Sequence, residues 1–405
     1  MTPIQYDTAQ GKRPRPTVAV IRAEWKCRLP GWLQPFLTWL LGYPYHGQQP
    51  LFPNKPWWVA ILIPIAVLMV GLTFAVAIFN QGGYAWFAVP VAWLLVVNGA
   101  RTLQVHICHQ GIHENLSGDR SKDRAVVELV STMIFVQDHD GYKGDHDGIH
   151  HPRLASDNDP DRQFTIEVMK IEPGADKADN RKRFVTALFT PKIHVLFLLG
   201  RIKANFVTCP SYRRLMSLIW LAAIIVMLAA TRNWMLFLVA CVLPMTALYH
   251  VSAMCQFVTE HFWARRQQAG QTRKSHYLSL LLNRHLGDPL PEAELKGLDC
   301  WFRWIVWWGR LLLYHLPVRL GVLVADLPVH GGHHLWPRDK RWTEAIYTNY
   351  ELAEQSGSCP VELVGSYLEI LDLVMESFSE APPATDCVKK STMTFTQALN
   401  VTNGM

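Results

Sequence analysis

The sequence predicts an all-α integral membrane protein with four transmembrane helices in two hairpins and a cytoplasmic helical cap. Two observations predict this fold: long apolar runs that occur in pairs, and an excess of basic residues before the first run. Clusters of histidine at the ends of the runs, all on one side of the expected topology, agree with it. Half of the 405 residues are hydrophobic and 16 are tryptophan, so the chain is more apolar than an ordinary soluble protein.

The apolar runs define the expected spans. Residues 57–79 contain no charged side chain, and at about 1.5 Å rise per residue they cover a hydrocarbon core of about 30 Å. A short polar turn separates them from a second run at about 84–104. A second hairpin is expected over about 214–231 and 234–257. We therefore expect a membrane domain at residues 57–375, preceded by a cytoplasmic segment at 1–56 with an interfacial helix at 31–41, and followed by a disordered tail at 376–405.

The distribution of charge orients the two hairpins. The first 56 residues carry seven Lys and Arg against two acidic residues, whereas the two hairpin turns together carry only Arg232. Because cytoplasmic loops are rich in Lys and Arg, the N-terminus is expected in the cytoplasm, and each closed hairpin returns the chain there. The expected location is a bacterial inner membrane, with both termini and every histidine cluster on the cytoplasmic side.

The remaining composition excludes other classes. The net charge of +6 comes without a basic block interleaved with aromatic residues, so membrane orientation explains it better than nucleic-acid binding, and no nucleic acid is expected as a partner. The eight cysteines form no CxxC pair, which is typical of reduced thiols.

Nine histidines lie at the edges of the apolar segments, in three clusters and one singleton. The clusters read HQGIH from residue 109, HDGIHH from 146 and HGGHH from 330. Residues three or four apart share one face of a helix, so each cluster presents two or three imidazoles together. Imidazole is a preferred ligand of iron, zinc and copper, which indicates a multinuclear metal centre. The candidate ligands are His109, His113, His146, His150, His151, His261, His330, His333 and His334.

Each motif also has a simpler interpretation. On its own, HQGIH is as typical of ordinary interfacial histidines as of a metal site, whereas three imidazoles within six residues need a common partner. Acidic residues around the second cluster are candidates to accept a distal ring N–H from a ligand, or are loop and helix-cap residues. These are Asp138, Asp140, Asp145, Asp147 and Asp157. The other eight histidines are left out of the ligand set.

The order of these motifs resembles a known superfamily. HxxxH, HxxxHH, a lone histidine in Thr259-Glu260-His261-Phe262-Trp263 and HxxHH together resemble the membrane fatty acid desaturases and hydroxylases, which include alkane monooxygenases, over roughly residues 57–340. The resemblance implies that the nine histidines bind two iron ions (Fe2+/Fe3+) on the cytoplasmic face, with O2 as co-substrate. Many desaturases have two residues, not three, between the first histidines of the second box. The three-residue form also occurs in hydroxylases, and Glu260 beside His261 is similar to the alkane hydroxylases.

The resemblance implies an O2-dependent fatty acid desaturase, with a hydroxylase of an alkyl or acyl lipid as the alternative on the same scaffold. An unactivated C–H bond has no acidity that side chains can exploit, so its cleavage needs an oxidising metal centre, and no catalytic residue is expected beyond the ligands. A lipid or fatty-acyl chain would approach between the spans with its head group at the interface. The sequence has no flavin, nicotinamide or HPGG haem motif, so a separate ferredoxin, rubredoxin or cytochrome is expected to supply electrons.

Two other classes are weaker alternatives. A histidine-rich metal transporter would place ligating residues near the bilayer midplane, where only His250 is expected inside a span. A zinc hydrolase needs only three protein ligands, and the sequence contains no HExxH motif. The sequence leaves open the choice between desaturation and hydroxylation, the acyl chain length, carrier and regiochemistry, the identity of the donor, and the oligomeric state.

Overall fold

The structure, a computed structural model of the chain, describes residues 16–382. These residues are mostly helical, and the predicted fold class is confirmed. A small parallel sheet adds to the predicted all-α fold. It pairs β1 (Leu282–Leu286) with β2 (Val361–Gly365), with Leu282 opposite Val361 and Leu286 opposite Gly365.

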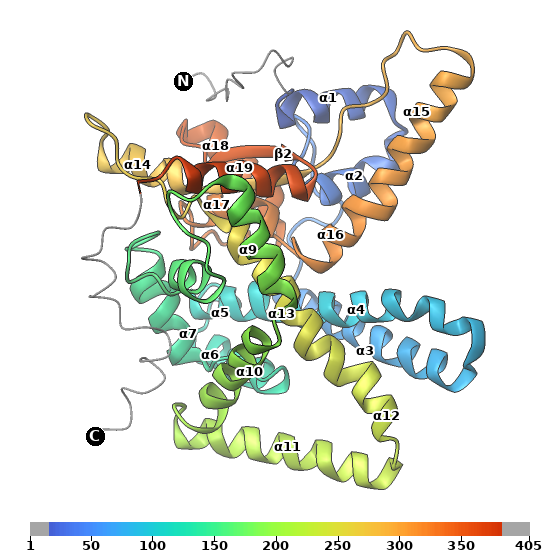
Figure 1. The fold of residues 1–405 in the computed structure, drawn as a ribbon, viewed down its shortest axis with the longest axis vertical. Coiled ribbons are helices and arrows are strands. Elements are labelled where there is room, and N and C mark those ends of the chain that lie inside the picture. Colours follow the sequence, from blue (N-terminus) through green and yellow to red (C-terminus); the bar gives the residue numbers. More distant parts are fainter. Residues whose placement is uncertain (1–15, 383–405) are drawn as a thin grey trace.

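Within residues 16–382, four helical runs are long and apolar enough to span a membrane. α3 (Trp57–Gln81) packs against the run Gly83–Ile112, whereas α11 (Ser211–Thr231) is followed after a short turn by the run Trp234–Glu260, which diverges from it (Figure 1). The second run comprises η2 (Gly83–Ala88), α4 (Val89–Thr102), η3 (Leu103–Cys108) and α5 (His109–Ile112). The fourth comprises α12 (Trp234–Phe237), η6 (Leu238–Val242), η7 (Pro244–Leu248) and α13 (Tyr249–Glu260). The four predicted spans are therefore present as two consecutive pairs, each joined by a short turn, and the fourth run packs against α4.

Glycines allow the first hairpin to pack closely. A Cβ atom on Gly99 would lie 2.7 Å from both the backbone nitrogen of Leu68 and the carbonyl oxygen of Pro64, so only glycine permits this separation of α3 and α4. Gly82 and Gly83 at the turn both have positive φ, which glycine adopts without steric cost.

The N-terminal helices pack on a helix from the other end of the sequence. They are α1 (Val18–Arg28), η1 (Gly31–Leu33) and α2 (Gln34–Leu41), and they share an apolar cluster with α15 (Gly297–Arg310). Trp25 meets Trp307 edge to face at 5.5 Å between ring centroids. Residues 31–41 are helical, with Leu37 buried in this cluster and Trp32 exposed. The place of this segment in the membrane interface remains a prediction.

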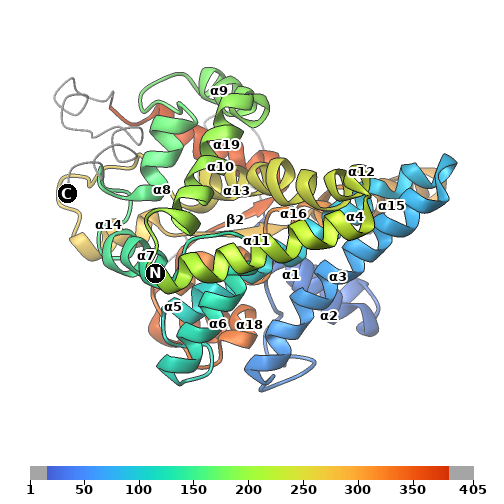
Figure 2. The same ribbon diagram turned by 90° about the horizontal axis from the view of Figure 1, so that it is seen from below.

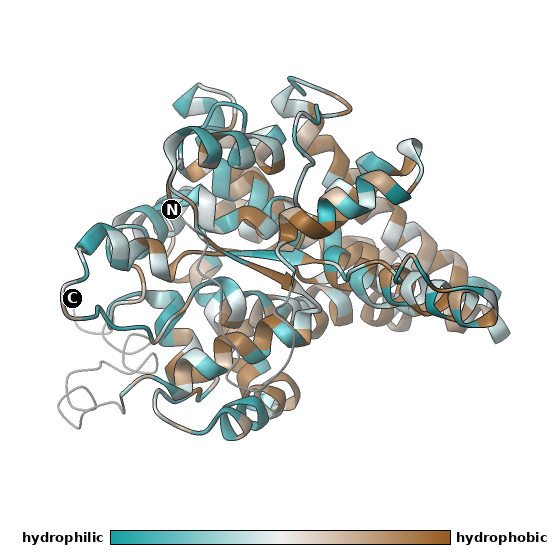
Figure 3. Ribbon diagram, turned by 90° about the horizontal axis from the view of Figure 1, so that it is seen from above, coloured by the Kyte–Doolittle hydropathy of each residue, from teal (hydrophilic) through white to brown (hydrophobic). Residues whose placement is uncertain are grey.

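We call residues 113–210 and 261–382 the helical cap. Most of the cap lies at the end of the spanning helices away from the two hairpin turns, while α15 projects from it toward the side of the α3–α4 turn (Figures 1 and 2). Figure 3 shows hydrophilic residues concentrated in the cap and hydrophobic residues along the helices that extend from it. The cap also contains a bend of 62° between α9 (Lys177–Phe189) and α10 (Pro191–Phe206).

Further short helices complete the cap. Before the second hairpin these are α6 (Arg120–Met133), α7 (His139–Asp145), η4 (His146–His150), α8 (Pro160–Gln163) and η5 (Phe164–Val168). After it come α14 (Arg273–Leu280), η8 (Leu311–His315), α16 (Leu316–Gly321), η9 (Leu327–Val329), α17 (His330–His333), η10 (Trp342–Glu344), α18 (Ala345–Ser356) and α19 (Tyr367–Ser379).

The start of the expected C-terminal tail needs a correction. α19 continues to Ser379, past the expected boundary at residue 376, and Ser366 begins it with a capping box that includes Glu369. Val374, Met375 and Phe378 are buried in the main cap core, which explains why the helix extends so far. Residues 383–405 of the expected tail lie outside the described residues.

Candidate metal centre

The structure brings all nine predicted histidines together where the spanning helices enter the cap. They form two groups, and within each group one ring nitrogen per residue lies within 4.8 Å of the others. The five-histidine group contains His109, His113, His146, His151 and His333. The four-histidine group contains His150, His261, His330 and His334. The second and third sequence clusters are thus each divided between the two groups.

The first cluster lies at the end of the second spanning run. The π-helical turn η3 precedes α5, and such turns change the direction of the side chains that follow. α5 packs against α6 at Gly111, where a Cβ atom would lie 2.3 Å from Cγ2 of Val127. Beyond His113, Asp123 accepts hydrogen bonds from the backbone N–H groups of Leu116 and Ser117 and so fixes the loop. These contacts hold His109 and His113 on the same side of the helix.

The second cluster is itself a π-helical turn. His146–His150 forms η4, and the N–H of His151 donates to the carbonyl oxygen of His146 at 2.9 Å. Because a π turn is wider than an α turn, the residue five ahead returns to nearly the same side. Nε2 of His151 therefore lies 3.0 Å from Nε2 of His146, while His150 joins the other group.

The third cluster needs its two glycines for close packing. A Cβ atom on Gly331 would lie 2.8 Å from the backbone nitrogen of Leu282 in β1, and one on Gly332 would overlap the side-chain amide of Asn349. α17 therefore lies directly against β1 and α18. His261 is positioned in a different way, because it follows α13 in an extended conformation and forms a β-bridge with Leu281.

The nitrogens of the five-histidine group form a continuous chain of contacts. Nε2 atoms are separated by 3.0 Å between His151 and His146, 2.7 Å between His146 and His109, 3.3 Å between His109 and His113, and 2.9 Å between His113 and His333. A neutral ring nitrogen carries either one proton or one lone pair and so makes one hydrogen bond, which means that hydrogen bonds can satisfy no more than two of these four contacts. A cation bound by the lone pairs would satisfy all of them.

The four-histidine group contains buried nitrogens that lack partners. Both ring nitrogens of His261 and Nε2 of His150 have no hydrogen-bond partner and no contact with solvent. Nε2 of His330 lies 3.2 Å from Nε2 of His334. Leaving such polar atoms buried and unpaired costs free energy, which a bound ion would offset.

Burial keeps most of these imidazoles uncharged. It lowers the pKa of His261, His330 and His334 well below the usual value. Burial and the neighbouring imidazoles do the same for His146 and His333, and they lower the pKa of His151 to about 2. Neutral imidazole is the form that binds metal ions, so the donor set is suitable for two transition-metal ions.

Side chains behind the rings orient several of them. Asp147 contacts Nδ1 of His113 at 2.7 Å, and Asp159 contacts Nδ1 of His150 at 3.0 Å. The hydroxyl of Tyr277 lies 3.3 Å from Nδ1 of His334. Burial lowers the pKa of His150, but the charge and hydrogen bond of Asp159, together with the charges of Asp161 and Glu260, outweigh it and raise this pKa to about 9. A carboxylate on Nδ1 leaves Nε2 free as a metal ligand.

The candidate carboxylates were predicted only in part. Of the five acidic residues named from the sequence, Asp147 contacts a candidate ligand, whereas the others cap a helix or bind other side chains. Asp138 caps α7, Asp140 pairs with Arg124, Asp145 accepts from Gln137 and Asp157 pairs with Arg162. Asp159 was not among the predicted residues. Its signal is local, because an Asp directly before Pro160 is typical of a helix N-cap, and Asp159 caps α8.

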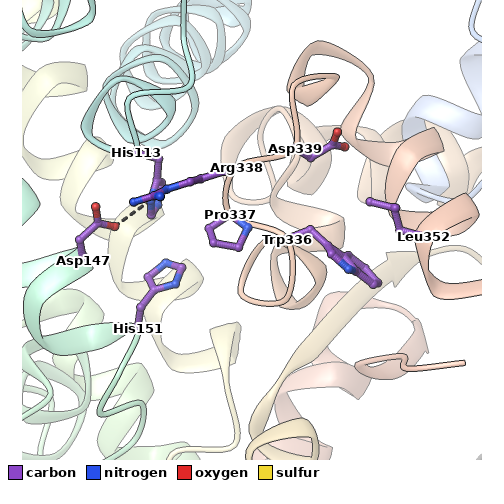
Figure 4. Close-up of a pocket in the computed structure, with 8 residues that line it drawn as sticks. All are labelled: His113, Asp147, His151, Trp336, Pro337, Arg338, Asp339 and Leu352. Atoms are coloured by element: carbon purple, nitrogen blue, oxygen red, sulfur yellow. Dashed lines mark ion pairs between the residues drawn. The ribbon is translucent and has the colours of Figure 1, made fainter. Parts of the chain in front are cut away.

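An open cavity of about 660 Å³ reaches the five-histidine group from outside. Figure 4 shows His113, His151 and Asp147 on one side of this cavity and the segment from Trp336 to Asp339 on the other, with Leu352 behind it. The side chain of Arg338 extends across the cavity toward His113 (Figure 4). The eight histidines left out of the ligand set all lie outside both groups.

Comparison with known proteins agrees with this geometry. A family described as fatty acid desaturase matches residues 84–345, which is more than half of the chain and includes all nine histidines. No curated protein matches the chain. With four candidate spanning helices and histidine clusters that can bind metal ions, the chain belongs to the fatty acid desaturase family.

Proposed function

We propose that this protein is a membrane di-iron oxidoreductase that uses O2 and external electrons to desaturate a fatty-acyl chain. The family supports lipid oxidation in general. The observation that carries the finer proposal is the convergence of nine histidines into two groups with mutually close ring nitrogens. So many neutral donors exceed what a single zinc ion needs and match two ions of a metal that accepts imidazole.

The protein's own residues hold and orient the ions. The five-histidine group would bind one iron and the four-histidine group the other. When bound, the irons supply the capacity to reduce O2 and to oxidise a C–H bond. Asp147 and Asp159 keep a proton on Nδ1 of His113 and His150, which fixes the tautomer and aims Nε2 at the ion.

The reaction balances only if an external donor supplies electrons. Desaturation removes one hydrogen from each of two adjacent carbons and forms the double bond between them. These hydrogens, with two electrons and two protons from outside, reduce one O2 to two waters. Hydroxylation is the alternative, in which one oxygen atom enters the C–H bond and the other leaves as water. The three-residue spacing within HDGIHH and the Glu260-His261 pair favour this alternative.

The substrate and partners follow from the position of the centre. His109 lies at the end of one spanning run and His261 directly after another, so a lipid chain between the spans has a short path to the histidines. The same position favours an enzyme over a transporter, whose ligands would lie nearer the middle of the spans. We propose that a separate ferredoxin, rubredoxin or cytochrome docks at the cap, and that the cap faces the cytoplasm of a bacterial inner membrane.

Expression with a competent electron donor, followed by mass spectrometry of the cellular lipids, tests the activity. The proposal predicts a new double bond in the acyl chains, and a new hydroxyl group would select the alternative. For any His→Ala substitution within the metal centre, exposed His46 provides the matched control, because His46→Ala removes an imidazole that belongs to neither group. Absence of any new lipid, with iron bound and the donor shown to reduce it, would contradict both.

A further inference from the structure

Glu260 is a buried carboxylate at the edge of the four-histidine group. It ends α13 directly before His261, and its side chain is only 4% exposed. Oε1 lies 3.0 Å from Nε2 of His330, and Oε2 is buried with no hydrogen-bond partner. A buried carboxyl oxygen without a hydrogen-bond partner is costly, and a bound cation would satisfy it.

The contact with His330 is hard to explain as an ordinary hydrogen bond. Nε2 of His330 also lies 3.2 Å from Nε2 of His334, so it is one of the nitrogens that would surround the ion. A nitrogen whose lone pair binds a metal carries no proton and has nothing to donate to Glu260. Two neighbouring atoms bound to one metal at about 2.1 Å are themselves about 3 Å apart. The separation of 3.0 Å is therefore that expected of two adjacent ligands.

A chain of buried polar side chains holds Glu260 in place. Gln256, one helical turn earlier, donates from Nε2 to Oε1 of Glu260 at 2.9 Å. Oε1 of Gln256 in turn accepts a hydrogen bond from Arg101 on α4. Arg101 is 1% exposed and also donates to Gln104. This network links the second and fourth spanning runs and fixes the position of the carboxylate.

We propose that Glu260 is a fifth ligand of the metal ion held by the four-histidine group. The inference rests on the proposed function for the presence of that ion. It gives each ion five protein ligands, all imidazole in one group and four imidazoles with one carboxylate in the other. The negative charge makes the two ions chemically different.

The isosteric variant Glu260→Gln tests the assignment on the purified full-length protein. It keeps the shape of the side chain and removes its charge. The purified apo-protein is loaded anaerobically with Co(II), and release of the two ions is followed against chelator concentration and in the visible absorption spectrum. We expect one of the two ions to bind at least about 10-fold more weakly, since even a carboxylate that only contacts a ligating histidine contributes that much. Its absorption bands should shift, and the other ion should be unchanged.

Asp299→Asn is the matched control, because Asp299 is an exposed acid on α15 and should leave both ions as in the wild type. If Glu260→Gln binds both ions with the affinity and spectrum of the wild type, the proposal is wrong. If this variant does not fold, Glu260→Asp decides, since it keeps the charge but withdraws the carboxylate by one methylene. Selective weakening of one ion in that variant supports the proposal, and wild-type binding overturns it.

The proposed function fails in a different way. A wild-type protein that binds no pair of ions would contradict the di-iron centre itself. A wild-type protein that binds two ions, both indifferent to Glu260, would contradict only the role of this residue.

Discussion

The two histidine groups differ in how far they are shielded from water. In the five-histidine group, His151 and His333 are only half-buried, and His113 and His151 line the open cavity. Every member of the four-histidine group is buried, with an exposure of 6% or less. The acidic partners follow the same pattern, since Asp147 is 25% exposed and Asp159 is fully buried.

This difference indicates a division between an outer and an inner position. Small solutes from the aqueous side reach the five-histidine group first, through the cavity beside Arg338. The four-histidine group lies against α13 and β1 in the interior of the protein. We therefore expect the two ions to differ in their exchange with solvent and in their dependence on buried carboxylates.

The largest expected effect comes from removing an inner ligand. His150→Ala deletes a ligand of the four-histidine group and leaves Asp159 buried without its imidazole. We expect loss of the inner ion and loss of lipid product, because an unpaired buried charge adds to the missing ligand. Elemental analysis and lipid mass spectrometry measure both outcomes. Retention of two ions and of the product would show that His150 is not a ligand.

The acidic partners should differ in importance. Asp159→Asn should weaken binding of the inner ion by about 10- to 100-fold, which is typical for loss of a carboxylate behind a ligating histidine. Asp147→Asn should weaken binding of the outer ion less, because Asp147 is partly exposed and also forms an ion pair with Lys143. Chelator titration of the two variants in parallel makes the comparison. A larger effect from Asp147 would contradict the division into inner and outer positions.

A change in the third cluster should affect both groups alike. The added Cβ of Gly331→Ala would lie 2.8 Å from the backbone nitrogen of Leu282, so the backbone of β1 or of α17, which carries His330 and His333, must shift. Overpacking of this kind costs about 1–3 kcal/mol of stability. We expect a lower thermal midpoint and weaker binding of both ions. Gly144→Ala is a control, because nothing lies within 4 Å of the added atom. Weakening of one ion alone would show that the groups are not joined through α17.

The smallest expected effect is purely kinetic. Leu352→Trp adds bulk to the cavity that opens on the five-histidine group. We expect a hydrophilic chelator to remove the outer ion several-fold more slowly, with no change in equilibrium affinity. Stopped-flow absorbance of the Co(II)-loaded protein follows the release. Slower release of the inner ion alone would contradict the role of this cavity.

Local sequence signals explain what could be predicted. The apolar runs predicted the four spans, and the spacing of HQGIH, HDGIHH and HGGHH predicted that imidazoles would share helix faces. The division into groups of five and four could not be predicted, because it depends on π-helical turns such as η4, which send His150 and His151 in different directions. The rule that residues three or four apart share a face of an α-helix does not predict this division.

Long-range contacts explain the rest of what was missed. Leu282 pairs with Val361 across 79 positions of the sequence, and neither short segment has a clear strand pattern. Tyr277 reaches His334 only because α14 and α17 come together in the folded cap. Gly331 and Gly332 are visible in the HGGHH motif. The need for glycine at these positions, which is close packing on β1 and Asn349, becomes apparent only in the folded protein.

In the proposed centre, nine histidines from four stretches of chain bind two iron ions. Elemental analysis with Mössbauer spectroscopy tests it most directly, on full-length protein purified from cells supplied with iron. We expect two irons per chain with two distinct signals, one from the all-imidazole site and one from the inner site. A single zinc ion per chain, with no iron, would contradict it.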